Sequence, residues 1–199
     1  MTTEEKILEA ARDEFMLNGY SGCRMRSISD KAGINKGLLH YYFKSKDALF
    51  LQVFDSTFQE LMAGLRNALA QDLHLIEKIE LIVDLYSTHF KKNPGLPAFV
   101  LQEANRDQNS EFLNHKRKNM SPMAGIFHTA VEQAKEKGEI RADIKSEHLF
   151  LSLLSLMIFP VLAKPMTCVM MNKTEEEHQT MMEERRAFVK QFIKQAIQL

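Results

Sequence analysis

Basic side chains are concentrated in one short stretch near the start of the sequence. Six of the seven charged residues between positions 23 and 46 are Lys or Arg, which gives this stretch a net charge of +5. The whole chain of 199 residues is formally neutral, with 26 basic and 26 acidic residues. A local excess of positive charge is typical of surfaces that bind the phosphates of nucleic acids. A basic face that is merely solvated would have the same charge, so charge alone leaves both interpretations open.

Residue types that often perform catalysis are not arranged for it here. The seven histidines form no HExxH pattern, the two cysteines, Cys23 and Cys168, have no metal-binding spacing, and no glycine-rich phosphate loop is present. His128 and Glu132 are four residues apart, but a single pair of this kind is common by chance. Cys23 is either a redox sensor or a small buried residue. We therefore expect no enzyme activity, no cofactor and no metal site.

Composition is that of a globular protein, with 45% hydrophobic and 26% charged residues. Two cysteines are too few for a disulfide framework and no secretory signal opens the chain, so we expect a cytoplasmic protein. The longest apolar run, from Leu149 to Ala163, is interrupted by Pro160 and is shorter than the roughly 20 residues that span a bilayer. We expect it to form a buried or interface helix, with no membrane contact.

Almost every segment places apolar residues at helical spacing, and none alternates as a strand does. The sequence therefore predicts an all-α fold of about nine helices. The first three are short and carry the positive charge, whereas the later ones are longer and more apolar. Their predicted ranges are 2–17, 25–32, 35–42, 46–71, 73–92, 97–105, 111–137, 146–164 and 174–199.

The stretch from Met25 to Tyr42 has the pattern of a helix-turn-helix. Gly33 ends the first short helix, and Asn35 is a suitable N-cap for the second. Asn35 and Lys36 place polar and basic groups at the start of a helix whose N-terminus could enter the major groove of DNA. A small residue where the helices cross and apolar residues between them complete the pattern: Ala32, Ile28, Ile34 and Leu39. An ordinary helical corner is the alternative.

The segment GYSGCRMRSISDKAGINKGLLHYYFKSKDALF resembles the DNA-binding segment of the TetR family of transcriptional repressors. The match is carried by Gly19-Tyr20, Ile28, Ala32-Gly33-Ile34, Lys36-Gly37, Leu39, Tyr41-Tyr42-Phe43 and Lys44-Ser45-Lys46. The resemblance implies a three-helix DNA-binding domain over residues 1–46 and a larger helical domain for ligand binding and dimerisation over residues 47–199. It also implies a homodimer that regulates transcription, mostly as a repressor. Such a dimer binds a palindromic operator in double-stranded DNA and leaves it when a small effector binds.

The resemblance, together with the local positive charge, implies that ten residues contact DNA, and among them Lys36, Tyr41, Tyr42 and Lys46 match the family's phosphate and backbone contacts. The recognition helix would run from about Asn35 to Tyr41, and Gly37 would let its backbone approach the DNA closely. The residues expected to contact DNA are Arg24, Arg26, Asn35, Lys36, Gly37, Leu38, His40, Tyr41, Tyr42 and Lys46.

Three of these positions depart from the usual family pattern. Arg24 stands where a Ser or Thr N-cap is common, and a poor cap costs about 0.5–1 kcal/mol, so we hypothesise that Arg24 contacts a DNA phosphate instead. Leu38 replaces a small polar residue and either touches a thymine methyl group or packs inward. His40 replaces a tyrosine, and its protonation near the usual histidine pKa of about 6.5 would strengthen DNA binding.

Phenylalanine and methionine are abundant beyond residue 47, which suits an apolar pocket, although an ordinary core would have the same composition. The family geometry places a pocket for a small, largely apolar effector among the middle helices. The residues expected to line it are Phe58, Met62, Tyr86, Phe90, Phe99, Gln102, Met123 and Phe127.

The expected dimer face consists of the Leu149–Ala163 helix and the C-terminal helix. The first is apolar nearly all round and needs cover on several sides. The second has a strong apolar stripe, which includes Phe188 and Phe192. In a symmetric dimer both helices would pack on their copies. The alternative from another class is an all-helical small-molecule-binding protein on the same scaffold that does not bind DNA.

Overall fold

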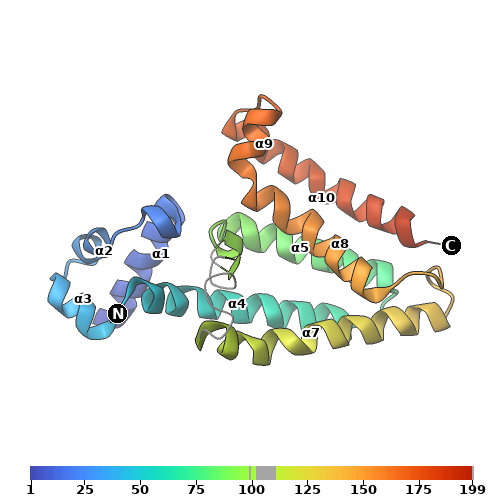
Figure 1. Ribbon diagram of the computed structural model, residues 1–199, viewed down its shortest axis with the longest axis horizontal. Coiled ribbons are helices and arrows are strands. Elements are labelled where there is room, and N and C mark those ends of the chain that lie inside the picture. The colour runs from blue at the N-terminus through green and yellow to red at the C-terminus, as the bar shows by residue number, and fades with distance from the viewer. Residues whose placement is uncertain (99, 102–110, 199) are drawn as a thin grey trace. The chain divides into compact units, whose positions relative to one another are not determined.

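The computed structural model describes residues 1–98, 100–101 and 111–198, except for the side chains of Ser56 and residues 111–121. All regular secondary structure in these residues is helical, which confirms the all-α class (Figure 1). The chain divides into two compact units, Met1–Glu60 with Asn93–Phe112 and Leu61–Lys92 with Leu113–Leu199. The first unit extends past residue 46 because it includes the first turns of the long helix α4, Lys46–Ala70. The functional division between residues 46 and 47 stays a prediction.

The first unit contains α1 (Thr3–Gly22), α2 (Met25–Lys31) and α3 (Lys36–Tyr42). A reciprocal pair of hydrogen bonds between Thr2 and Glu5 caps α1. This helix runs further than predicted, because the chain resumes a last turn after Gly19, whose φ is +66°. The rings of Phe15 and Phe50 meet edge to face with centroids 4.6 Å apart and join α1 to the start of α4. A shared core of this kind holds the short helices in place.

The second unit contains the end of α4 and the longer helices. These are α5 (Leu75–Lys92), α7 (Glu111–Glu136), α8 (Ser146–Leu162), α9 (Lys164–Met170) and α10 (Glu175–Ile197). A methyl group added at Gly64 of α4 would lie 2.8 Å from the side chain of Leu85, so glycine allows α4 and α5 to pack closely. Of the predicted helix 97–105, residues 97–98 and 100–101 are helical, and the others lie outside the described residues.

The helix predicted over residues 146–164 is α8, which ends at Leu162, and an unpredicted short helix, α9, follows it after a bend of 77°. Pro160 has no N–H and leaves the carbonyl of Leu156 without its usual helical partner. Arg185 of α10 places Nη2 3.4 Å from that carbonyl oxygen. Pro165 then lies in the first turn of α9, where a proline is well tolerated. α8 continues through Pro160 to Leu162, and the bend lies between Leu162 and Lys164, just before Pro165.

In the part of the chain that the structure describes, no single helix has both the length and the apolar composition of a membrane span. Only the bent pair of α8 and α9, counted together, meets those criteria.

A group of three charges joins α5 to α10. Asp84 accepts hydrogen bonds from Nε of Arg186 at 2.5 Å and from Nζ of Lys190 at 2.6 Å. Burial by itself would raise the pKa of Asp84, but the hydrogen bonds and charges of the two cations outweigh it and lower that pKa. The ionised carboxylate therefore stabilises the contact between the two helices.

We expect Asp84→Asn to lower the free energy of unfolding by about 1–2 kcal/mol near neutral pH, because two partly buried cations lose their shared anion. A carboxyl group with a depressed pKa contributes its full stability above its unfolded pKa of about 3.9 and loses it as the pH falls through the folded pKa. The difference between the two proteins should therefore be constant above about pH 5 and shrink below about pH 4. Urea unfolding across this pH range measures the difference in the free energy of unfolding. A difference that grows at low pH would contradict the lowered pKa of Asp84.

Candidate nucleic-acid interface

The turn between α2 and α3 is held by local hydrogen bonds. Oδ1 of Asn35 accepts a hydrogen bond from the backbone N–H of Leu38 at 2.8 Å, which confirms Asn35 as the N-cap of α3. Gly33 has a φ of +68°, a left-handed conformation that glycine adopts at little cost. The N–H of Ile34 donates to the carbonyl of Ser29 at 3.0 Å. These contacts set α3 at a defined angle to α2, as a helix-turn-helix requires.

Most of the α3 surface faces outward. Leu39 is completely buried and anchors the helix, whereas Tyr41 is 80% exposed. Lys36, Gly37 and His40 are exposed as well. A helix that is anchored by one apolar side chain and presents basic, aromatic and imidazole groups to solvent is suited to lie in a groove of DNA.

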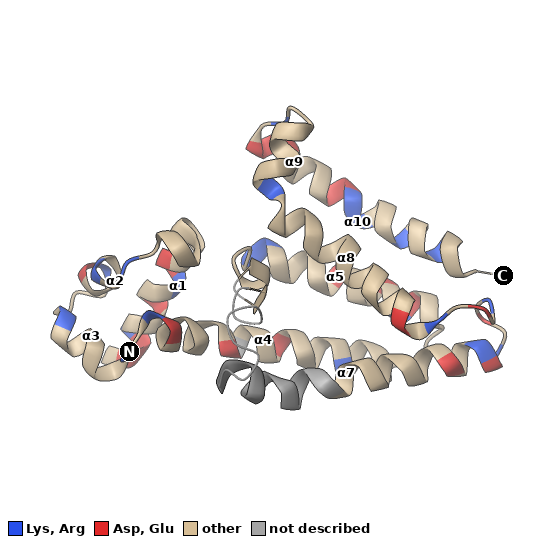
Figure 2. Ribbon diagram, in the orientation of Figure 1, with Lys and Arg blue, Asp and Glu red and all other residues tan. Residues whose placement is uncertain are grey.

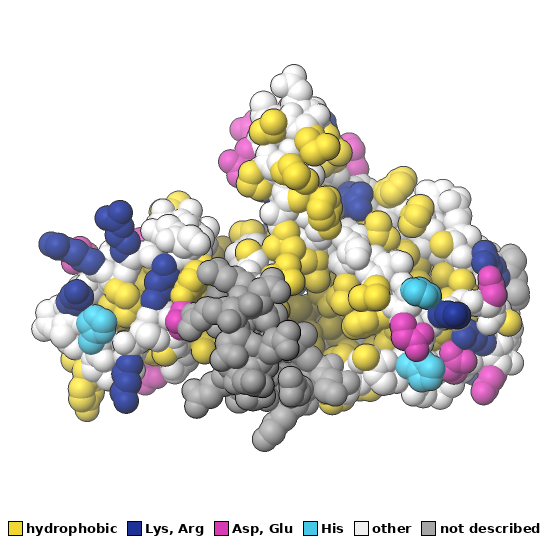
Figure 3. Space-filling model, in the orientation of Figure 1, with side chains coloured by type: hydrophobic (Ala, Val, Ile, Leu, Met, Phe, Trp, Pro, Cys, Tyr) yellow, Lys and Arg dark blue, Asp and Glu magenta, His cyan; other side chains and the backbone are white. Residues whose placement is uncertain are grey.

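Basic residues surround this helix (Figure 2). The space-filling view shows Lys and Arg side chains standing out over α2 and α3 (Figure 3). Arg26 lies 4.0 Å from Asp30, and Lys31 lies 3.1 Å from Asp13. Both pairs are exposed, and exposed ion pairs contribute little, so these cations can exchange their partners for phosphates.

Two of the unusual positions have a defined place in the structure. Arg24 is the N-cap residue of α2 and makes no side-chain cap hydrogen bond, as expected. Leu38 is 36% exposed and does not pack in the core, although its contact with a base stays a prediction. A methyl group added at Gly37 would lie 3.3 Å from Oδ1 of Asn35, so this glycine also leaves room for the cap.

Lys46 has a role within the protein that the sequence did not indicate. Its Nζ donates a hydrogen bond to the carbonyl of Cys23 at 2.8 Å and lies 4.4 Å from the centroid of the Tyr20 ring. The hydroxyl of Tyr20 donates in turn to Asp47. Lys46 thus ties the link between α1 and α2 to the start of α4, and its contact with DNA stays a prediction.

Cys23 is 3% exposed, and burial raises the pKa of its thiol to about 11. The thiol is therefore protonated and shielded near neutral pH, which favours the small buried cysteine over the redox sensor.

No group of three or more His, Cys, Asp or Glu residues in the described ranges is arranged to hold a metal ion. The Nδ1 atom of His128 lies 2.7 Å from Oγ of Ser146, which gives this histidine a structural contact between α7 and α8.

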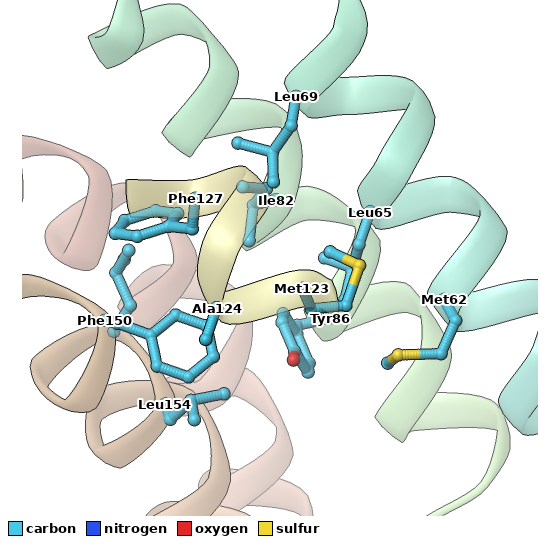
Figure 4. A pocket seen from close by; sticks show the side chains of 11 residues that line it. Met62, Leu65, Leu69, Ile82, Tyr86, Met123, Ala124, Phe127, Phe150 and Leu154 are labelled. Carbon is cyan, nitrogen blue, oxygen red and sulfur yellow. The ribbon is translucent and has the colours of Figure 1, made fainter. Parts of the chain in front are cut away.

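The second unit holds an apolar cavity of about 170 Å³ among α4, α5, α7 and α8 (Figure 4). Four of the residues predicted to line an effector pocket line this cavity: Met62, Tyr86, Met123 and Phe127. The use of the cavity as an effector site stays a prediction. Phe90 packs beside Tyr86, with ring centroids 5.2 Å apart, and is absent from the lining, as is the buried Phe58. Phe99 and Gln102 lie outside the described residues.

Sequence reasoning missed the other residues of this lining, because Leu, Ile, Ala and Phe at helical spacing look the same in a core and around a cavity. They are Leu65, Leu69, Ile82, Ala124, Phe150, Leu153 and Leu154.

Two helices of the second unit carry apolar side chains on their outer faces. On α8, Leu151 is 59% exposed, and on α10 Phe188 is 58% exposed and stacks on Phe192 with centroids 6.0 Å apart. The adjacent face of α10 packs inward through the buried Val189 and Ile193. Figure 3 also shows hydrophobic side chains on the surface of α9. An apolar surface of this kind marks an interaction site.

Comparison with known proteins gives matches along most of the chain. Residues 7–53 match the family model described as bacterial regulatory proteins, tetR family, and residues 76–193 match a tetracyclin repressor-like C-terminal domain. The HTH-type transcriptional repressor NicS of Pseudomonas putida is 31% identical over 165 residues, which cover 79% of this chain and 74% of that protein. The fatty acid metabolism regulator protein of Bacillus subtilis is 23% identical over 84% of this chain and 83% of its own. The ketosteroid transcriptional regulator KstR2 of Mycobacterium tuberculosis shares the fold, with a TM-score of 0.74 and 16% identity over 100% of this chain and 96% of that chain.

Proposed function

Since the chain belongs to the tetR family of bacterial regulatory proteins, we propose that it represses transcription as a homodimer bound to a palindromic operator and leaves the operator when a small apolar ligand binds. The observation that carries the DNA contact is the outward face of α3, where Lys36 and Tyr41 stand free of the core. A protein that acts on the chromosome works in the cytoplasm. The relative named a transcriptional repressor supports repression.

The exposed faces of α8 and α10 support the homodimer. Leu151, Phe188 and Phe192 present a large apolar surface that a second copy would bury. A two-fold axis through this surface places the same residues of both copies against each other. The dimer then presents two copies of α3, and two recognition helices related by two-fold symmetry read a palindrome.

The helix α4 supports coupling between ligand and DNA. It begins at Lys46, which contacts the link between α1 and α2, and it supplies Met62 and Leu65 to the cavity. A ligand that displaces α4 would change the spacing of the two recognition helices. It can weaken DNA binding only by its difference in affinity for the two conformations, typically 1–3 kcal/mol, or about 5- to 150-fold. Unchanged operator affinity in protein saturated with ligand would exclude this route.

Salt dependence tests the DNA contact, because each phosphate contact releases counterions. With about 6–10 phosphate contacts per dimer, operator affinity should fall by about 10³–10⁵ between roughly 50 and 200 mM salt. We expect Arg24→Thr to lessen the slope of log affinity against log salt by about one unit for each phosphate contact removed. Fluorescence anisotropy with a labelled duplex measures both slopes. An unchanged slope in the variant would mean that Arg24 contacts no phosphate.

A further inference from the structure

The cavity in the second unit is almost wholly apolar. Ten of its eleven described lining residues are Met, Leu, Ile, Ala or Phe, and the eleventh is Tyr86. None of these eleven carries a charge. A charged group placed among them would lose its hydration without gaining a counter-charge from this lining.

Tyr86 supplies the only hydroxyl group among the eleven described lining residues. The residue is 8% exposed, and Figure 4 shows its oxygen among the other side chains of the cavity. Burial raises the pKa of the phenol to about 12, so the hydroxyl keeps its proton near neutral pH and can donate. A buried hydroxyl gains from an acceptor, because leaving it without one costs desolvation energy.

The size of the cavity limits its occupant. Apolar cavities of about 150 Å³ stay dry and accept a molecule the size of benzene. The cavity here, at about 170 Å³, has room for one ring with small substituents and opens to solvent beside the exposed Ala124.

We infer that the effector is an uncharged molecule about the size of one substituted aromatic ring, with one hydrogen-bond acceptor that receives the Tyr86 hydroxyl. This inference rests on the proposed function, because it takes the cavity as the effector site. Tyr86 is then the residue that selects a polar neutral effector over a hydrocarbon, and the apolar lining is what rejects ions.

Three probes with one skeleton and planar head groups of one shape test the charge. They are 4-ethylacetophenone, 4-ethylbenzoate and 4-ethylbenzamidinium, which are neutral, anionic and cationic. Titration calorimetry with the full chain near neutral pH should show the ketone binding on the order of 100-fold more tightly than either ion, because only the ions must be desolvated without a partner. Comparable binding by either ion, or no binding by the ketone, would overturn the inference.

Tyr86→Phe tests the hydrogen bond. We expect this variant to bind the ketone about five-fold more weakly, as the loss of one neutral hydrogen bond predicts. A fourth probe, 4-ethyl-α-methylstyrene, has the shape of the ketone but no acceptor, so its affinity should be the same for both proteins. Equal losses for the two probes, or no loss for the ketone, would refute the role of Tyr86.

Ala124→Phe tests the location. Ala124 is an exposed residue of the lining, so a larger side chain there should occupy the cavity without disturbing the core. We expect ketone binding to disappear while the circular dichroism spectrum and melting temperature stay close to those of the parent protein. Unaltered ketone binding would place the probe elsewhere and overturn the assignment.

These titrations contain no DNA, so their outcome is independent of the operator. Release of a labelled operator by the bound ketone is measured separately. Binding without release would contradict the proposed function and leave the ligand class standing.

Discussion

Replacing Lys36 and Tyr41 together with alanine is expected to lower the affinity for a specific duplex by on the order of 100-fold or more, because a base or phosphate contact is commonly worth about 1–3 kcal/mol. Both side chains are exposed on α3, and neither contributes to the core that Leu39 anchors. Each dimer would lose the contacts twice. The stability of the protein should therefore change little while its DNA binding collapses.

Anisotropy titrations with a labelled duplex measure this loss, and thermal unfolding checks the fold. Lys137→Ala is a matched control, because Lys137 is an exposed lysine just after α7 in the second unit. The control should bind the duplex as the parent protein does. Parent-like affinity in the double variant, with the fold intact, would remove α3 from the DNA interface.

The second large effect is expected at the proposed dimer face. Phe188 is 58% exposed on α10, and we expect Phe188→Glu to convert the dimer into monomers. The substitution removes apolar area that the second copy would bury and places a carboxylate from each copy near the same axis. Operator affinity should then fall by on the order of 100-fold or more, because each monomer holds only one half-site and the advantage of two linked contacts is lost.

Sedimentation velocity reports the change in mass, and the same duplex reports the change in affinity. Leu73→Glu is the control, since Leu73 is a partly exposed apolar residue ahead of α5 and outside the proposed face. It should leave both measurements unchanged. A dimer that survives Phe188→Glu, or a monomer that binds the palindrome as tightly as the parent protein, would refute this face.

The helix-turn-helix could be predicted because its signals are local. The Asn35 cap and the Gly33 turn depend on the conformation of a few neighbouring residues, and both are present in the structure. The hydrogen bond from Lys46 to the carbonyl of Cys23 could not be predicted, because the two residues are 23 positions apart in the chain. The bend between α8 and α9 was not predicted, because α9 begins at Lys164, where the predicted helix ends, and its residues are also mostly apolar.

Tertiary context decided the rest. The final helix is apolar on two faces, and only the fold determines that Val189 and Ile193 face inward while Phe188 and Phe192 face outward. The cavity posed a similar problem: Met62 and Tyr86 were identifiable as large flexible or aromatic residues, whereas its leucines look like any core leucine. Composition reveals which residues avoid water, and packing decides which of them enclose a space.

Selection from a random duplex library with the purified protein, followed by sequencing, tests sequence-specific DNA binding most directly. The Lys36→Ala, Tyr41→Ala double variant runs beside it. We predict that the parent protein enriches a palindrome and that the double variant does not, as expected for a dimer that reads two half-sites through α3. No enrichment by the parent protein at low salt, where phosphate contacts are strongest, would contradict the proposed function and favour a ligand-binding protein that does not bind DNA.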